Sequence, residues 1–89
     1  MFYYIYVLFS REDKGIYTGF TNDLKRRIKE HNQGNVDSAK NRQLLDLIYF
    51  EGYKSKKAAC QRERYLKTGW GRNYLNKIIG DFLENNPKI

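Results

Sequence analysis

The N-terminal stretch MFYYIYVLF constrains the fold of this chain more than any other segment. Aromatic and β-branched side chains dominate it, and this composition is typical of β-strands. A bilayer-spanning helix needs about 20 apolar residues, so this stretch is too short to cross a membrane. It also has neither the basic leader nor the cleavage site of a signal peptide. We therefore predict a buried strand from Phe2 to Phe9.

The size and cysteine content of the chain limit how it can be stabilised. A chain of 89 residues buries only about 60% of the surface that its unfolded form exposes. Its single cysteine, Cys60, cannot form an internal disulfide, which favours a reducing compartment and hence the cytoplasm. We expect one domain over residues 1–84 and a frayed C-terminal tail at residues 85–89.

Turn and capping signals divide the first half of the chain. The segment SREDKG separates the first strand from a second one at Ile16–Phe20, which predicts a β-hairpin. Thr21 and Asn22 offer N-cap side chains for a helix over Asp23–His31. Gly34 is a suitable residue for ending that helix.

The second half of the chain continues with a loop, a strand and two helices. Residues 33–43 have no apolar periodicity, whereas residues 44–50 read as a strand. Ser55 is expected to cap a helix that runs through Lys67 and stops at Gly69. A third helix over residues 72–84 has one apolar stripe: Leu75, Ile78, Ile79, Phe82 and Leu83. The order ββαβαα predicts an α+β domain in which helices cover a three-stranded antiparallel or mixed sheet.

Two basic side chains share the apolar side of the first predicted helix. Helical spacing puts Arg27 and His31 on the same side as Leu24 and Ile28. Arg27 either snorkels past the edge of the helix or belongs to a functional site. The outer face then consists of Lys25, Arg26, Lys29 and Glu30.

A carboxylate lies on the inward side of the second predicted helix. Glu63 shares a stripe with Ala59 and Leu66, which should face the sheet. A lone carboxylate in that position would be neutralised unless it finds a cation or hydrogen-bond donors. An ion pair with Arg27 and a metal ion are both consistent with this pattern.

The predicted hairpin brings tyrosines together. Alternation places Tyr6 on one face of the first strand, and Tyr17 and Gly19 on one face of the second. If the hairpin loop is centred between residues 11 and 12, Tyr6 lies directly opposite Tyr17. The two rings then either pack together or form a functional pair of hydroxyls. Gly19 marks a position where a ligand or another part of the chain comes close.

These residues together resemble the GIY-YIG nuclease family. The motif YIY ends at Tyr6 and YTG begins at Tyr17, and Arg27, His31 and Glu63 follow in the family's order. The likeness is greatest to small single-domain bacterial members, which are related to the N-terminal nuclease domain of the excinuclease C subunit. Two positions depart from the family pattern: Tyr4 replaces a glycine and Thr18 replaces an isoleucine.

The resemblance implies a catalytic role for each of these five residues. Glu63 would hold one Mg²⁺ or Mn²⁺ ion, and Arg27 would contact the scissile phosphate. Tyr6 would be the general base, with Tyr17 beside it and His31 accepting or relaying the proton. We expect Arg27, the metal ion and a hydrogen bond from Tyr17 to lower the pKa of Tyr6. A family asparagine would correspond to Asn73 or Asn76.

A net charge of +7 favours a nucleic acid partner. The resemblance favours DNA over RNA. We expect no membrane partner. Contacts to the nucleic acid backbone are expected from Gly19, Lys40, Arg42, Lys54, Lys56 and Lys57. A protein partner could supply specificity. The alternatives are a non-catalytic nucleic-acid-binding module on the same scaffold, and an interaction domain that docks through the third helix if Phe82 and Leu83 are exposed.

Overall fold

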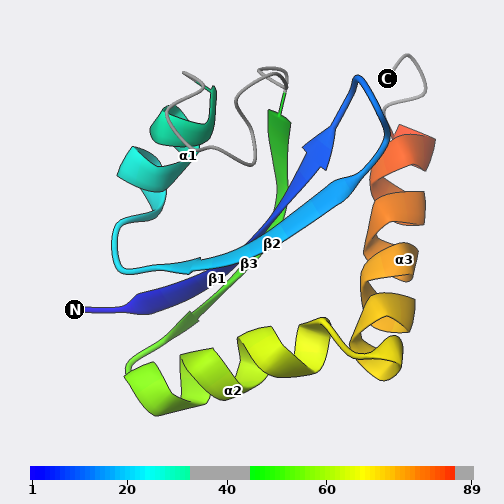
Figure 1. The fold of residues 1–89 in the computed structure, drawn as a ribbon. Coiled ribbons are helices and arrows are strands. Elements are labelled where there is room, and N and C mark those ends of the chain that lie inside the picture. Colours follow the sequence, from blue (N-terminus) through cyan, green and yellow to red (C-terminus); the bar gives the residue numbers. More distant parts are fainter. Residues whose placement is uncertain (33–44, 86–89) are drawn as a thin grey trace.

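The computed structural model describes residues 1–32 and 45–85. Its elements are β1 (Tyr3–Ser10), β2 (Ile16–Thr21), α1 (Leu24–Asn32), β3 (Leu45–Tyr53), α2 (Lys56–Leu66) and α3 (Gly69–Asn85). The predicted α+β class and the order ββαβαα are confirmed (Figure 1). The predicted loop, the expected end of the first helix at Gly34, and both Lys40 and Arg42 lie outside the described residues.

The three strands form one antiparallel sheet in the order β2-β1-β3. The apolar N-terminal strand β1 is therefore the central strand, with a neighbour on each side. Its residues Ile5–Phe9 are at most 3% exposed. The density of aromatic and aliphatic side chains in this stretch follows from burial on both faces of the sheet.

The register of the hairpin differs from the expected one by two residues. Tyr6 pairs with Gly19, and Tyr17 pairs with Leu8, so the two tyrosines are diagonal rather than opposite. The loop is centred one residue later than expected because Lys14 adopts a positive φ of 62°. The backbone amide of Gly15 donates to the Asp13 carboxylate at 2.9 Å, which holds this turn.

Helices cover both faces of the sheet (Figure 1). On one face, α2 and α3 pack on a core that includes Ile5, Val7, Ala59, Leu66 and Leu75. On the other face, α1 packs through Leu24 and Ile28 on a smaller cluster built from Tyr6, Leu8 and Leu45. Each face has its own apolar cluster, and side chains of β1 contribute alternately to the two.

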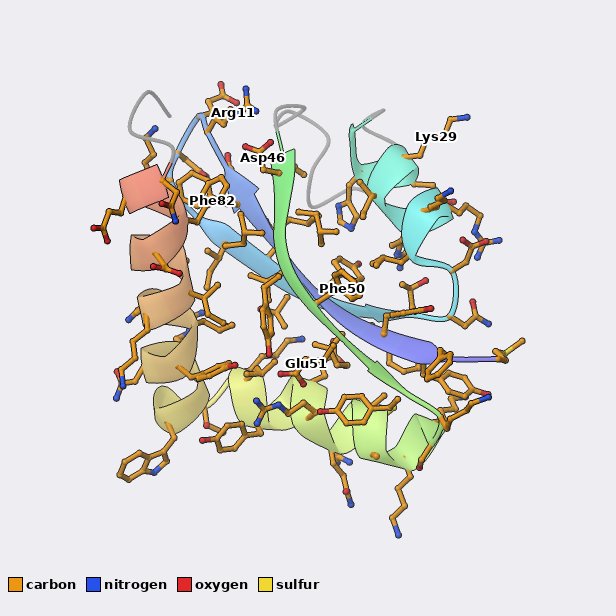
Figure 2. The ribbon with its side chains drawn as sticks, turned by 180° about the vertical axis from the view of Figure 1, so that it is seen from behind. Arg11, Lys29, Asp46, Phe50, Glu51 and Phe82 are labelled. Atoms are coloured by element: carbon orange, nitrogen blue, oxygen red, sulfur yellow. The ribbon has the colours of Figure 1, made fainter. Side chains whose placement is uncertain are left out.

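Strand β3 extends three residues beyond its predicted end, to Tyr53. A bulge interrupts its pairing with β1, since Val7 pairs with Tyr49 while Leu8 pairs with Leu47. Beyond the bulge, Phe50 pairs with Tyr6, and Glu51 pairs with Ile5. Directly paired residues share a face, so Phe50 faces the α1 side and Glu51 faces α2. Figure 2 shows Glu51 between β3 and α2.

The helix termini confirm one predicted cap and correct two. Ser55 caps α2, because its side chain accepts a hydrogen bond from the amide of Ala58. Asp23, rather than Thr21 or Asn22, caps α1 by accepting from the amide of Arg26 at 3.2 Å. Gly69 does not end α2; it begins α3, three residues before the predicted start at Arg72.

A tight junction joins α2 and α3. The side chain of Thr68 accepts from the amide of Gly71 at 3.3 Å and so caps α3. A side chain at Gly71 would overlap the backbone of Tyr65 and Leu66, so only glycine fits there. This close approach turns the chain and lets α3 pack beside the end of α2.

The predicted apolar stripe of α3 packs against the sheet. Leu75 is fully buried, and the other four stripe residues are half-buried. The ring of Phe82 packs on Phe9 with centroids 5.7 Å apart, where α3 meets β1 (Figure 2). The condition for a docking face on this helix, exposure of Phe82 and Leu83, is therefore not met. Helix α3 also includes Asn85, the first residue of the expected tail.

Candidate active site

Tyr6 lies at the centre of the polar cluster on the α1 side. Its ring crosses the neighbouring strand β2 over Gly19, where any side chain would overlap the Tyr6 ring and hydroxyl. Tyr6 itself is 3% exposed. Gly19 was expected to permit a close approach, and the group that approaches it is this tyrosine.

His31 and Tyr6 form a buried hydrogen bond. The Tyr6 hydroxyl lies 3.1 Å from Nε2 of His31, and the two rings meet edge to face. His31 is 4% exposed. Burial and the nearby Arg27 charge lower the pKa of His31 below 6.5, so the imidazole is neutral at pH 7. A neutral imidazole can accept a proton from the tyrosine.

Arg27 lies beside the Tyr6 hydroxyl, and each shifts the pKa of the other. The neighbouring hydroxyl raises the pKa of Arg27. Burial raises the pKa of Tyr6 above 10, although Arg27 acts in the opposite direction. In the absence of a metal ion, loss of hydration thus outweighs the arginine charge, and the lowering of the Tyr6 pKa by a bound metal ion stays a prediction.

The structure does not form the ion pair between Arg27 and Glu63 that was one of the sequence-based alternatives. Arg27 contacts Glu30 at 3.4 Å, and Glu63 contacts Lys67 at 3.3 Å. Glu30, which its spacing placed on the outer face, is half-buried. Each pair lies within its own helix: Arg27 and Glu30 are three residues apart in α1, and Glu63 and Lys67 are four apart in α2. Neither pair needs a tertiary contact to form.

Glu63 nevertheless lies close enough to Tyr6 for its charge to raise the tyrosine pKa. It belongs to α2, which contacts β2 from the opposite side of the sheet to α1 (Figure 1). Tyr6 reaches over β2, an edge strand of the sheet. The Tyr6 hydroxyl is thus at this edge, where the charge of Glu63 on α2 acts on it.

Tyr17 also packs in the apolar cluster under α1, and its hydroxyl is buried. Tyr6 and Tyr17 remain on the same face of the sheet, although they are diagonal neighbours. The structure thus places Arg27 and His31 beside Tyr6, keeps Tyr17 in the same apolar cluster and leaves Glu63 within range of its charge. Asn73 and Asn76 are both exposed on α3, so burial does not distinguish them.

Two nitrogen atoms of the cluster are buried without a hydrogen-bond partner among the described residues. They are Nε of Arg27 and Nδ1 of His31. Buried polar atoms are generally paired, so such atoms at one place point to a group bound during function. No group of three or more histidine, cysteine or acidic residues occurs in residues 1–32 and 45–85 that could hold a metal by itself.

The family model described as the GIY-YIG catalytic domain matches residues 2–76. This chain belongs to the GIY-YIG family. The match covers the two tyrosine motifs, Arg27, His31 and Glu63. The resemblance found in the sequence is thereby confirmed, and the family is one of nucleases.

Relatives of this GIY-YIG domain have similar lengths. It is 42% identical to a UPF0213 protein of Clostridium perfringens over 65 residues, 72% of this chain and 69% of that protein. It is 39% identical to a UPF0213 protein of Natronomonas pharaonis over 80 residues, 89% and 92% of the two chains. The solution NMR structure of the UPF0213 protein BH0048 from Bacillus halodurans matches with a TM-score of 0.59 and 30% identity, covering 100% of this chain and 97% of that one.

A second polar network was not predicted. On the α2 side, the Glu51 carboxylate accepts from both Nε and Nη2 of Arg62, at 2.9 and 3.0 Å, and from two tyrosine hydroxyls. Alternation in β3 gives a signal for it, because Tyr49, Glu51 and Tyr53 are spaced by two and share a face.

No helix of the described residues is long and apolar enough to cross a membrane.

Proposed function

We propose that this GIY-YIG domain is a divalent-metal-dependent endonuclease that hydrolyses phosphodiester bonds in DNA, in repair or recombination. One observation carries the proposal. The Tyr6 hydroxyl is held at the buried, neutral His31 beside the Arg27 guanidinium, and Glu63 is close by. A proton acceptor, a phosphate ligand and a carboxylate thus occur within one cluster.

The donor set fits a hard divalent cation that keeps most of its water. Glu63 is a single carboxylate with a 23% exposed side chain, and its contact to Lys67 is a surface pair that a cation could displace. Mg²⁺ is usually bound by one or two carboxylates together with waters and substrate phosphate. Glu63 would hold the Mg²⁺ or Mn²⁺ ion, which supplies positive charge at the phosphate when it is bound.

Tyr6 and His31 would move the proton of the attacking water. Because the pKa of Tyr6 is raised, the tyrosine is protonated at neutral pH and cannot begin as a tyrosinate. Instead, the Tyr6 hydroxyl passes its proton to Nε2 of His31 while its oxygen takes a proton from the water. This relay needs the His31 tautomer that carries its hydrogen on Nδ1. The water oxygen bonds to phosphorus, and the bond to the leaving ester oxygen breaks. The leaving oxygen takes a proton from solvent water and departs as the alcohol.

Arg27 would bind the phosphate under attack. Its planar guanidinium suits two parallel hydrogen bonds to phosphate oxygens, and its Nε is without a partner among the described residues. The contact to Glu30 keeps the guanidinium positioned before substrate arrives. Tyr17 would pack beside Tyr6 and limit the entry of bulk water.

Exposed lysines would bind the nucleic acid backbone. Lys54, Lys56 and Lys57 are exposed around the beginning of α2. Lys40 and Arg42 carry the same expectation from the sequence alone. Contacts of this kind give affinity that falls steeply with salt and carry little sequence information. A protein partner would then supply specificity, and we expect the chain to act in the cytoplasm.

Cleavage assays with a matched glutamate control test this function. Labelled single-stranded, duplex and branched DNA, with the corresponding RNA strands, are incubated with wild type, Glu63→Ala and Glu84→Ala in Mg²⁺, in Mn²⁺ and in EDTA. Glu84 is an exposed glutamate on α3. We expect metal-dependent cuts by wild type and Glu84→Ala, and none by Glu63→Ala.

Two results would contradict the proposal. Full activity of Glu63→Ala would remove the metal role of Glu63. Salt-sensitive binding without cutting by any of the three proteins would instead indicate the non-catalytic binding module. Preference for RNA over DNA strands would correct the substrate but keep the reaction.

A further inference from the structure

Three aromatic rings form a continuous exposed strip on the α1 side of the sheet. The ring centroids of Phe2 and Tyr4 are 6.3 Å apart, and those of Tyr4 and Phe50 are 6.1 Å apart. Phe2 is 44% exposed and Phe50 is 51% exposed. We refer to Phe2, Tyr4 and Phe50 as the aromatic platform. Large apolar side chains exposed in contact with one another are less common on a surface than single ones.

The platform is one wall of an open pocket of about 370 Å³. Tyr4 and Phe50 line it from the sheet, and residues 22–25 line it from the beginning of α1. The pocket therefore has flat aromatic faces on one side. On the other side it has the polar side chains of Asn22, Asp23 and Lys25. This is the combination that a nucleobase requires, since its faces are apolar and its edges carry hydrogen-bonding groups.

The platform adjoins the candidate active site. Phe50 pairs directly with Tyr6 across β1 and β3, and paired residues share a face. Adjacent strands are about 4.8 Å apart, so the backbones of the two residues are direct neighbours. The Tyr6 ring runs in the other direction, over Gly19 of β2. Tyr6 consequently leaves Phe50 uncovered, as its exposure shows.

The charges around the platform favour a nucleic acid over an apolar protein surface. The Lys54 ammonium lies 4.8 Å from the centroid of the Phe2 ring, and Lys25 lines the pocket. The acidic Asp23 caps α1 and lies 4.0 Å from Arg26, which offsets its charge. A basic rim around exposed aromatic rings is the arrangement by which proteins bind single strands.

We propose that the aromatic platform stacks an unpaired base of the strand that is cut at Tyr6, so that single-stranded or flapped nucleic acid is the substrate class. This inference rests on the proposed nuclease function. A paired base presents only its edges in the grooves, whereas an unpaired base exposes both faces for stacking. The phosphate next to such a base would reach the Arg27 and Glu63 side of the sheet.

Binding in EDTA tests the platform without cleavage. A fluorescein-labelled single strand, an abasic strand of the same length and a duplex are titrated with wild type, Phe50→Ala, Phe50→Leu and Trp70→Ala. Trp70 is the matched control because it is an aromatic side chain outside the platform, 78% exposed on α3. Phe50→Leu keeps an apolar side chain but removes the flat ring. Circular dichroism verifies that each variant is folded.

We expect both Phe50 variants to bind the single strand about tenfold more weakly or worse, which is the usual effect of losing one base–aromatic stack. Their affinity for the abasic strand should not change, because only phosphate contacts remain there. Trp70→Ala should bind both strands as wild type does. A strand containing 2-aminopurine should be quenched on binding wild type and less so on binding Phe50→Leu.

The proposed role of the platform would be overturned if Phe50→Leu bound the single strand as tightly as wild type. It would also be overturned if the variant lost as much affinity for the abasic strand as for the normal single strand. Preference of wild type for the duplex would also overturn it. These results are distinct from failure of the nuclease function. If Glu63-dependent cleavage persists while the Phe50 variants bind normally, only the platform fails. If Phe50 governs binding and no cleavage occurs, only the nuclease function fails.

Discussion

Two polar clusters on opposite faces of the sheet use the same residue types and reach opposite states of hydrogen bonding. On the α2 face, the Glu51 carboxylate accepts four hydrogen bonds, two from Arg62 and one each from Tyr49 and Tyr53. On the α1 face, Tyr6 lies beside Arg27 and His31 and within range of the Glu63 charge, but two buried nitrogen atoms are without a partner among the described residues. The first cluster is complete in itself, and the second is not.

The difference indicates which cluster stabilises the fold and which one binds a ligand. Burial alone would raise the pKa of Glu51, yet the hydrogen bonds from Arg62, Tyr49 and Tyr53 hold it below its usual value. The carboxylate is therefore charged and satisfied, which stabilises the native state. In the Tyr6 cluster, unused donors cost stability unless substrate occupies them. Four matched comparisons test this division of roles.

The largest expected effect separates two tyrosines. Tyr6→Phe removes the hydroxyl that relays the proton, and loss of general base catalysis lowers rates by about 10²–10⁴-fold. Tyr49→Phe removes a hydroxyl of the Glu51 network and should leave the rate per folded molecule unchanged. Single-turnover cleavage with both variants measures this. Equal activity of Tyr6→Phe and wild type would exclude Tyr6 as the base.

The second comparison separates two glutamates by stability. Glu51→Gln leaves Arg62 without its carboxylate in a partly buried site, for which we expect a loss of about 2–3 kcal/mol in the free energy of unfolding. Glu63→Gln breaks only the surface pair with Lys67, which is worth less than about 1 kcal/mol. Urea titrations of both variants give these values. A larger loss in Glu63→Gln than in Glu51→Gln would reverse the assigned roles.

The third comparison uses two glycines. In Gly19→Ala the new methyl group collides with the Tyr6 ring, so overpacking of about 1–3 kcal/mol and a misplaced hydroxyl should lower both stability and cleavage. Gly80, inside α3, has open space around it, and Gly80→Ala should stabilise by up to about 1 kcal/mol. Thermal melts and cleavage rates test both. Normal cleavage by Gly19→Ala would show that Tyr6 does not need its observed position.

The smallest expected effect is a difference between two pH windows of stability. The pKa of His31 is lowered in the folded state, so the unfolded chain binds a proton first as the pH falls through 6.5, and stability declines from there until the folded pKa is reached. The pKa of Glu51 is also lowered, and its stabilisation is lost only as the pH falls from 4.5 through its folded value. Melting temperatures from about pH 2 to about pH 7 should show both declines.

Variants assign the two windows. His31→Gln should remove the decline that begins near pH 6.5, and Glu51→Gln should remove the more acidic one. Cleavage by the folded protein should fall only as the pH drops through the lowered pKa of folded His31, at the acidic end of the upper window, because a protonated His31 cannot accept the proton of Tyr6. A rate that is independent of pH there, in a protein that remains folded, would argue against the relay through His31.

Local patterns in the sequence predicted the elements and most of the Tyr6 cluster. The apolar run predicted a buried β1, and helical spacing put Arg27 and His31 on the inward side of α1, where they meet Tyr6. These inferences succeed because periods of two and 3.6 residues determine which side chains share a face. Ser55 was identified as a cap for the same local reason.

Only the tertiary structure decided the features that depend on register and on contacts between distant segments. The positive φ of Lys14 moved the hairpin register, so Tyr6 lies over Gly19 instead of opposite Tyr17. Burial then raised the pKa of Tyr6, whereas the charges expected near it from the sequence predicted a lower pKa. Residue spacing determines the face on which a side chain lies; hydration and the exact neighbour are set when the strands and helices pack together.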